Sequence, residues 1–335
     1  MTDKTINPAS VPFKKLPSEV VIPAVGLGTF GSDNYDNETI AAAVETAVCM
    51  GYRHIDCASV YGNEKEIGNM LHRLFAEGVV RRDELWITSK VWNDMHDRVV
   101  ESCEKTLKDL QLDYLDLYLV HWPFPNSHAK GVSVDSRDKN ARPYIHSEYM
   151  KTWQAMESLV DKGLVKHIGT SNMTKPKMEL LLADCRIKPL VNEMELHPHF
   201  QQEELYQYML SNGIQPIGFC PLGSPNRPAR DKTPDDTCEF EDEVILKIAR
   251  AHNVHPASIC LKWAVQRGEI VIPFSVKAEK IYSNLYNTTI DPLSDEEMAE
   301  LSHIDKACRL VKGQVFTWEG ADWKDLWDED GIIKK

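Results

Sequence analysis

The chain has 335 residues, 42% of them hydrophobic, which is enough to bury a large core in one barrel or in two smaller domains. Its 51 acidic and 38 basic side chains give a net charge of −13, which argues against nucleic-acid backbones and anionic membranes as general partners. The sequence has no apolar run close to the ~20 residues of a membrane helix, no apolar N-terminal signal segment and no Cys-x-x-Cys pair among its eight scattered cysteines, so we expect a reduced, cytoplasmic protein.

The first predicted elements are two short runs, at residues 13–16 and 20–22, on either side of Pro17-Ser18-Glu19. This pattern is typical of a β-hairpin. A glycine-rich stretch from Gly26 to Gly31 then fits the six-residue pattern of dinucleotide-binding folds, but a polar loop follows it instead of a helix. Because that fingerprint needs a helix N-terminus to hold a pyrophosphate, we favour a strand and a loop here over a Rossmann site.

From residue 38 onward, helical periodicity alternates with short β-rich runs to the end of the chain. Eight strands are predicted near residues 26–30, 53–57, 85–90, 115–121, 165–170, 189–193, 214–219 and 270–274. Strands that alternate with helices in this way indicate a (β/α)8 TIM barrel. No interdomain linker interrupts the series, so we interpret residues 1–335 as a single domain, with the N-terminal hairpin across the bottom of the barrel.

Three segments are longer than the usual connections in such a barrel. They are residues 122–146, residues 224–238 and the tail at 304–335, which contains Trp318, Trp323 and Trp327. We expect all three at the rim of the barrel as lids and walls of a substrate pocket. Plain solvated loops would have a similar composition, and the tail tryptophans suit an anchoring role as well as a pocket.

Three consecutive predicted strands end in side chains with acid–base chemistry. Asp56, Lys90 and His121 lie at these ends, and Tyr61 lies in the turn before the helix that begins near Glu64. Neighbouring parallel strands are about 4.8 Å apart, and the turns at one end of such a barrel carry its chemistry. We therefore expect Asp56, Tyr61, Lys90 and His121 to form one cluster, although each has an ordinary structural role when taken singly.

The motifs around this cluster resemble those of the aldo-keto reductases, in particular the aldose and aldehyde reductases. They are Gly-Tyr-Arg-His-Ile-Asp at 51–56, Ala-Ser-Val-Tyr-Gly-Asn-Glu at 58–64, Ser-Lys-Val-Trp at 89–92 and Leu-Val-His-Trp-Pro at 119–123. The similarity runs from about residue 25 to about residue 301, through Gly-Thr-Ser-Asn at 169–172 and Pro-Leu-Gly-Ser at 221–224. It implies an NAD(P)H-dependent enzyme that reduces a small aldehyde or ketone, such as a sugar aldehyde, to the alcohol.

Carbonyl reduction needs a hydride, which no side chain supplies, and a proton for the developing alkoxide. We assign the proton to Tyr61, whose phenol becomes an effective acid when the Lys90 ammonium stabilises its phenolate. Asp56 keeps Lys90 charged, and His121 orients the carbonyl oxygen. Relatives that reduce carbon–carbon double bonds carry a glutamate at the position of His121, so the histidine favours carbonyl reduction.

The resemblance also implies a set of cofactor-binding positions. They are Ser171, Asn172 and Glu193 at the carboxamide, Phe219 on the nicotinamide ring, Leu222, Ser224 along the pyrophosphate, and Phe274, Ser275, Val276, Lys280 and Asn284 around the adenosine. Two of them depart from the family pattern, with Glu193 in place of glutamine and Phe219 in place of tyrosine. An ionised Glu193 accepts a hydrogen bond from an amide nitrogen but donates none to its oxygen.

A third departure concerns the choice of cofactor. Relatives selective for NADPH place a lysine against the adenosine 2′-phosphate, where this chain has Phe274. Lys277 and Lys280 lie nearby as point charges, without the planar fork of an arginine. We therefore expect NADP(H) with a weakened preference, and use of NAD(H) as well.

Family position also implies substrate walls at Phe30, Val60, Trp92 and Trp122. Two alternatives stay open, a sugar or polyol dehydrogenase running in the oxidative direction and a cofactor-sensing protein that does not turn over. A barrel hydrolase or isomerase is disfavoured, and the potential ligands Glu195, His197 and His199 lack a second cluster, so we expect no metal. The sequence is consistent with a monomer or a homodimer.

Overall fold

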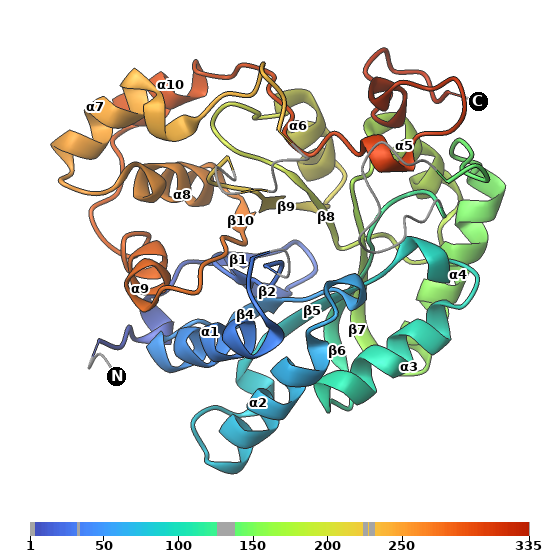
Figure 1. Cartoon of the computed structure of the whole chain (residues 1–335), viewed down its shortest axis with the longest axis horizontal. Helices are drawn as coiled ribbons and strands as arrows, with labels where there is room; N and C mark the ends of the chain where they lie inside the picture. The colour runs from blue at the N-terminus through green and yellow to red at the C-terminus, as the bar shows by residue number, and fades with distance from the viewer. Residues whose placement is uncertain (1–3, 32–33, 126–137, 224–226, 228–231, 335) are drawn as a thin grey trace.

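The computed structural model describes residues 4–31, 34–125, 138–223, 227 and 232–334. Eight parallel strands form its central sheet, with helices outside them (Figure 1). In chain order the strands are β3 (Leu27–Gly28), β4 (His54–Asp56), β5 (Trp86–Val91), β6 (Leu115–Val120), β7 (Val165–Ser171), β8 (Val191–Glu195), β9 (Gln215–Phe219) and β10 (Ile270–Val271). Each strand pairs with the next one in the sequence, as the alternation of strands and helices predicted.

The sheet closes on itself between its first and last strands. Val25 forms a parallel bridge with Val271, and the amide of Gly26 donates to the Val271 carbonyl over 2.8 Å. The amide of Gly28 donates to the Pro273 carbonyl over 3.1 Å. These bonds join β3 to the segment around β10, so the predicted (β/α)8 barrel is confirmed.

Helices cover the outside of the barrel, and all but the last two of them lie between consecutive strands in the chain. They are α1 (Asn37–Met50), α2 (Glu64–Ala76), α3 (Val99–Leu110), α4 (His146–Asp161), α5 (Lys175–Asp184), α6 (Glu203–Ser211), α7 (Glu243–Ala251), α8 (Pro256–Arg267), α9 (Ala278–Tyr286) and α10 (Asp295–Ser302). The first of them, α1, begins after Asp36, whose carboxylate accepts from the Thr39 amide over 2.8 Å. That start lies six residues beyond Gly31, so the helix does not open on the glycine stretch.

A two-stranded hairpin, β1 (Phe13–Lys15) and β2 (Val21–Pro23), precedes the barrel. Leu16 and Ile22 of this hairpin share an apolar cluster with barrel residues that include Trp86, Leu117 and Ile270. These barrel residues lie at or near the N-terminal ends of their strands. The hairpin therefore covers the bottom of the barrel and leaves the C-terminal ends of the strands for the site.

The strand limits differ slightly from those predicted, and one difference matters for the site. Lys90 was expected where a strand stops, but β5 continues through it to Val91. Its side chain is fully buried and contacts the carboxylates of Asp56 on β4 and Glu193 on β8.

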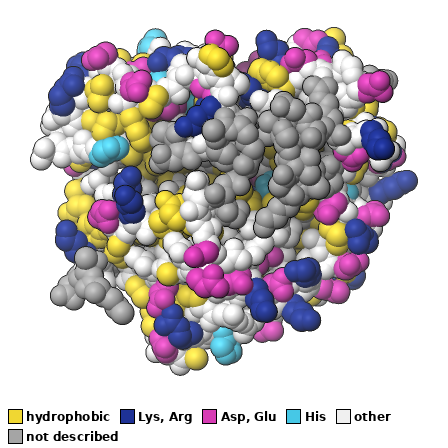
Figure 2. Space-filling model, viewed as in Figure 1, with side chains coloured by type: hydrophobic (Ala, Val, Ile, Leu, Met, Phe, Trp, Pro, Cys, Tyr) yellow, Lys and Arg dark blue, Asp and Glu magenta, His cyan; other side chains and the backbone are white. Residues whose placement is uncertain are grey.

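None of the helices among the described residues is long and apolar enough to cross a lipid bilayer. On the described part of the face in Figure 2, acidic and basic side chains are interspersed, and neither sign forms a continuous stripe.

Gly68 provides a test of the helix packing, because it lies where α2 meets α3. A methyl group at this position would lie 2.7 Å from the Leu110 Cα and closer still to the Asp109 carbonyl oxygen. Gly68→Ala should therefore destabilise the protein by about 1–3 kcal/mol, although alanine is the better helix former. Thermal unfolding measures the change, with Lys65→Ala on the exposed face of α2 as the control. An unchanged or raised midpoint for Gly68→Ala would contradict this packing.

Candidate active site

The four residues of the predicted cluster lie together at the C-terminal end of the barrel. Asp56 ends β4, Lys90 lies near the end of β5, His121 follows β6, and Tyr61 ends the short helix η2 (Ser59–Tyr61). The Lys90 Nζ lies 2.5 Å from the Asp56 Oδ2 and donates to the Cys57 carbonyl over 3.0 Å. The same nitrogen is 5.5 Å from the centre of the Tyr61 ring. One buried ammonium thus connects three of these elements.

Glu193 on β8 adds a second carboxyl group to this ammonium. Its Oε1 lies 3.3 Å from the Lys90 Nζ, and both side chains are almost completely buried. Burial lowers the pKa of Lys90, but Asp56 and Glu193 raise it by more, so that its pKa lies above the ordinary value. Lys90 is therefore charged at neutral pH. Sequence reasoning placed Glu193 beside the cofactor and missed its contact with Lys90.

Tyr61 is half-buried between the rings of Phe30 and His121, at centroid distances of 5.2 and 5.8 Å. Burial raises the pKa of its phenol, and the Lys90 charge lowers that pKa by less. We expected Lys90 to lower the pKa of Tyr61, but burial raises this pKa by more. The phenol is therefore protonated at neutral pH. A protonated phenol beside a fixed cation is suited to donate a proton to an oxygen that becomes negative.

His121 completes the polar end of the site as a neutral imidazole. Burial and the Lys90 charge hold its pKa well below the ordinary value. A neutral imidazole has one N–H donor, and the His121 Nδ1 is buried without a hydrogen-bond partner among the described residues. The ring contacts Trp92 edge-on at 5.1 Å. His121 can therefore hold a polar oxygen without adding a charge.

The polar groups expected at a carboxamide lie next to this cluster. Asn172 follows β7 with a φ of 58°, and its Nδ2 donates to the His121 carbonyl over 2.9 Å and to the Ser171 Oγ over 3.1 Å. Two buried acceptors, the Asn172 Oδ1 and the Glu193 Oε2, have no partner among the described residues. Such orphaned acceptors fit an amide NH2 group, so this end of the site suits a nicotinamide. Phe219, half-buried, ends β9 next to Glu195 on β8.

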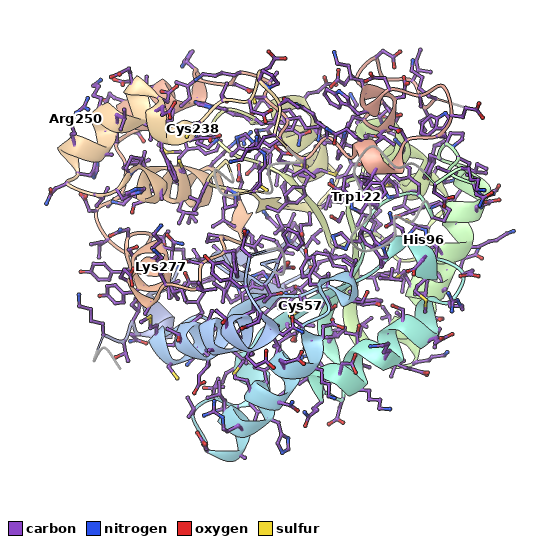
Figure 3. All side chains as sticks on the ribbon, in the orientation of Figure 1. Cys57, His96, Trp122, Cys238, Arg250 and Lys277 are labelled. Carbon is purple, nitrogen blue, oxygen red and sulfur yellow. The ribbon has the colours of Figure 1, made fainter. Side chains whose placement is uncertain are left out.

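The positions assigned to the adenosine lie around the start of α9. The Ser275 Oγ accepts from the Lys277 amide over 3.1 Å, just before α9 begins. Asn284 is buried, Ser275 and Val276 are half-buried, and Lys277 and Lys280 are exposed, with no carboxylate within 4 Å among the described residues. Figure 3 shows Lys277 beside α9, on the other side of the barrel from Trp122.

Phe274 and Leu222, two further predicted cofactor-binding residues, lie at different places at the C-terminal end of the barrel. Phe274 packs against Gly31 of the glycine stretch, and its ring centroid lies 6.0 Å from that of Tyr35. It is therefore an apolar contact, and it supplies no charge for a phosphate. Leu222 lies just after β9 and packs against the main core. Ser224 lies outside the described residues.

The four predicted wall residues divide into two groups. Phe30 and Val60 are exposed and Trp92 is half-buried beside His121, whereas Trp122 is only 6% exposed. Trp122 is covered by two residues of the C-terminal tail, Phe316 at 4.7 Å and Trp327 at 5.6 Å between ring centroids. Phe316 also contacts Trp92 at 5.7 Å. Sequence reasoning missed Phe316, although an aromatic residue in the predicted rim tail was a signal for it.

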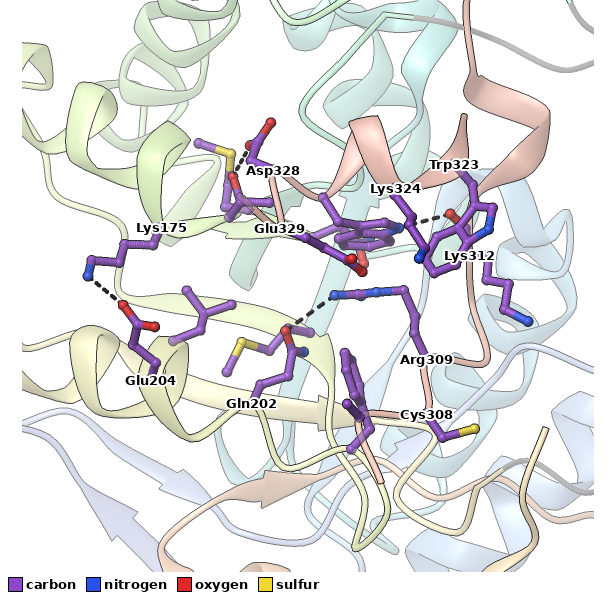
Figure 4. A pocket seen from close by; sticks show the side chains of 18 of the residues that line it. Lys175, Gln202, Glu204, Cys308, Arg309, Lys312, Trp323, Lys324, Asp328 and Glu329 are labelled. Carbon is purple, nitrogen blue, oxygen red and sulfur yellow. Dashed lines mark hydrogen bonds and ion pairs between the residues drawn. The ribbon is translucent and has the colours of Figure 1, made fainter. Parts of the chain in front are cut away.

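The tail is fixed to the barrel by buried polar contacts. The Lys177 ammonium of α5 pairs with Asp328, which also accepts from the Thr174 Oγ1 over 2.5 Å. The Arg309 guanidinium stacks on Trp327, 3.5 Å from the ring centre. Figure 4 shows Arg309, Trp323 and Asp328 around a pocket of about 1310 Å³ between this tail and α5 and α6. Trp327 thus has an anchoring role.

Glu195, His197 and His199 belong to the same anchoring system. The Glu195 carboxylate accepts from the amides of Leu310 and Val311 over 2.7 and 2.8 Å, and its Oε1 is 3.0 Å from the His197 Nε2. The carboxylates around His197 raise its pKa to about 9 although burial opposes the charge. This carboxylate and this histidine bind protein groups, and no set of metal ligands occurs among the described residues.

Comparison with known proteins agrees with the fold. The model of the aldo/keto reductase family matches residues 24–306. An aldo/keto reductase of Synechocystis is 44% identical over 312 residues, covering 92% of this chain and 94% of that protein. The aldo-keto reductase family 1 member A1 of Rattus norvegicus is 40% identical over 295 residues, 87% of this chain and 88% of that protein.

Two solved structures show the same likeness in three dimensions. A Bombyx mori aldo-keto reductase in complex with NADP has a TM-score of 0.79 at 31% identity, covering 92% of this chain and 96% of that one. The aldose reductase of Schistosoma japonicum has a TM-score of 0.78 at 36% identity, with coverages of 91% and 96%. The chain is an oxidoreductase by fold and motif. It belongs to the aldo-keto reductase family.

The buried pair of Lys177 and Asp328 should determine whether the tail stays on the barrel. Lys177→Met leaves a carboxylate buried without its cation, which costs about 3 kcal/mol or more. We expect faster hydrogen exchange at the amides of Leu310 and Val311 and unchanged exchange in β5 and β6. Lys175→Met is the matched control, since Lys175 also lies on α5 but pairs at the surface with Glu204 of α6. Equal exchange in the two variants would contradict the anchoring role of Lys177.

Proposed function

We propose that the protein catalyses NAD(P)H-dependent reduction of an aldehyde or ketone, with Tyr61 as the general acid. One observation carries the proposal: a buried, charged Lys90 lies beneath a protonated Tyr61, in contact with the Asp56 carboxylate. Such a cluster holds a proton donor next to a fixed positive charge, which stabilises the negative charge that remains after the proton is given up.

The other steps of the reaction are assigned to side chains around Tyr61 and to the bound nucleotide. A bound nicotinamide supplies the hydride, which no side chain can provide. Tyr61 gives its proton to the carbonyl oxygen, and the Lys90 ammonium stabilises the phenolate that this leaves. His121 donates a hydrogen bond to the same oxygen from its neutral ring, and Asp56 holds Lys90 in place. Phe30, Val60 and Trp92, with Phe316 of the tail, limit the access of water around the reacting carbonyl.

Ser171, Asn172 and Glu193 are the residues that we assign to the nicotinamide carboxamide, and Phe219 to the ring. The unpartnered acceptors of Asn172 and Glu193 support this assignment. Leu222 and Ser224 are assigned to the pyrophosphate, and Ser275, Val276, Lys280 and Asn284 to the adenosine. We place the protein in the cytoplasm because all eight of its cysteines are free thiols.

Replacing Tyr61 tests the assignment of the proton donor. Tyr61→Phe should lower kcat for an aromatic aldehyde by about a thousandfold or more, because the ring stays and only the donor is lost. Its affinity for the reduced nucleotide, measured by fluorescence titration, should stay close to that of the wild type. Tyr114→Phe at the opposite end of the barrel is the control and should keep full activity. Wild-type turnover in Tyr61→Phe would remove Tyr61 from this role.

The residue at position 274 should set the choice between the two nucleotides. We expect the ratio of kcat/KM for NADPH to that for NADH to lie below about a thousandfold, because Phe274 cannot pair with a 2′-phosphate. Phe274→Lys should raise this ratio about tenfold or more, and Phe274→Leu, which restores no charge, should leave it unchanged. Steady-state kinetics with both nucleotides measure the ratio. A bias above a thousandfold in the wild type would contradict the reading of Phe274.

A further inference from the structure

Glu193 is a carboxylic acid at a position where the family usually has a glutamine, and it lies in an unusual setting. Its Oε1 faces the Lys90 Nζ at 3.3 Å, while Asp56 approaches the same ammonium at 2.5 Å. Its Oε2 is buried and has no partner among the described residues. Two carboxyl groups therefore share one cation, and one oxygen of each, the Asp56 Oδ1 and the Glu193 Oε2, has no partner among the described residues.

We propose that Glu193 selects between the reduced and the oxidised nicotinamide according to whether it carries a proton. This inference rests on the proposed function, because it assumes that a nicotinamide binds beside β8. The inference goes beyond that function. It states that the protein prefers the oxidised or the reduced nucleotide depending on pH, and that the Glu193 side chain causes this dependence.

The two forms of the side chain differ in what they offer the ring. A protonated Glu193 has one O–H donor and one acceptor oxygen, so it matches both halves of a carboxamide as a glutamine does. An ionised Glu193 loses the donor and gains a negative charge. The oxidised nicotinamide ring is cationic and the reduced ring is neutral. The negative charge of an ionised Glu193 therefore stabilises the bound oxidised ring and does not stabilise the reduced ring.

The surroundings leave Glu193 as the group that changes charge near neutral pH. Burial raises its pKa to about 8, with a contribution from the Asp56 carboxylate, and Lys90 opposes this shift. The other groups that act on it are Lys90 and Asp56, in their ion pair, and Tyr61, with His121 next to Tyr61. The pKa values of Lys90 and Tyr61 lie above their ordinary values and that of His121 lies well below, so these three keep their charge states across this range.

Linkage gives the sign of the effect. Ionised Glu193 binds the oxidised nucleotide more tightly, so binding of that nucleotide lowers the pKa of Glu193 and releases a proton. The affinity for the oxidised nucleotide should therefore rise with pH relative to the affinity for the reduced one. In Glu193→Gln, which keeps the donor and the acceptor but cannot ionise, the ratio of the two affinities should not depend on pH.

The experiment is a fluorescence titration of the full chain with NADP+ and with NADPH at several pH values between about 6.5 and 9.5. For the wild type we expect the ratio of the NADPH to the NADP+ dissociation constant to rise about tenfold, which corresponds to a pKa difference of one unit between the two complexes. For Glu193→Gln we expect a flat ratio. Proton release on binding NADP+, measured by calorimetry in two buffers, should disappear in the variant.

The outcomes separate this inference from the proposed function. A flat ratio in the wild type, or the same slope in both proteins, overturns the role of Glu193 while nucleotide binding stands. Failure of both proteins to bind either nucleotide overturns the proposed function and the inference with it. The wild-type measurement alone decides the inference if Glu193→Gln does not fold.

Discussion

The structure depends on one buried charge, the ammonium of Lys90. A lysine that is fully buried would lose its proton without compensation, and here Asp56 and Glu193 provide that compensation from two other strands. The barrel makes this arrangement possible because side chains of β4, β5 and β8 point into its interior and meet there. The cation in turn acts on Tyr61 and His121, so the acid–base character of the site follows from the register of the strands.

The C-terminal tail is the second requirement, since it supplies part of the wall and comes from far along the chain. Phe316 closes the gap between Trp92 and Trp122, while Trp327 covers Trp122 from behind. The tail has little regular structure of its own, so its position depends on contacts with α5 and β8. The buried carboxylates of Asp328 and Glu195 make these contacts. Access to the proposed substrate pocket is thus linked to polar bonds outside the pocket.

Sequence reasoning located the eight strands to within a few residues, because hydrophobic periodicity is a local property. It also grouped Asp56, Tyr61, Lys90 and His121, because equivalent ends of successive parallel strands meet. It did not find the contact of Glu193 with Lys90, because that contact depends on the tilt of the strands in the barrel. It did not find the position of Phe316 either, because the tail contacts residues more than one hundred positions earlier in the chain. The direction of the pKa shift of Tyr61 could not be predicted from the sequence either. Burial raises this pKa and the charge of Lys90 lowers it, and the larger of the two effects depends on distances that only the structure gives.

The most direct test of this account is single-turnover reduction of an aromatic aldehyde by Lys90→Met, with the reduced nucleotide already bound. Methionine keeps the length of the side chain and removes its charge. The account predicts that the variant binds the nucleotide and yet transfers hydride at least about a hundredfold more slowly than the wild type, because Tyr61 loses the cation that stabilises its phenolate. Hydride transfer at the wild-type rate in a folded Lys90→Met protein would contradict the central role of the buried ammonium.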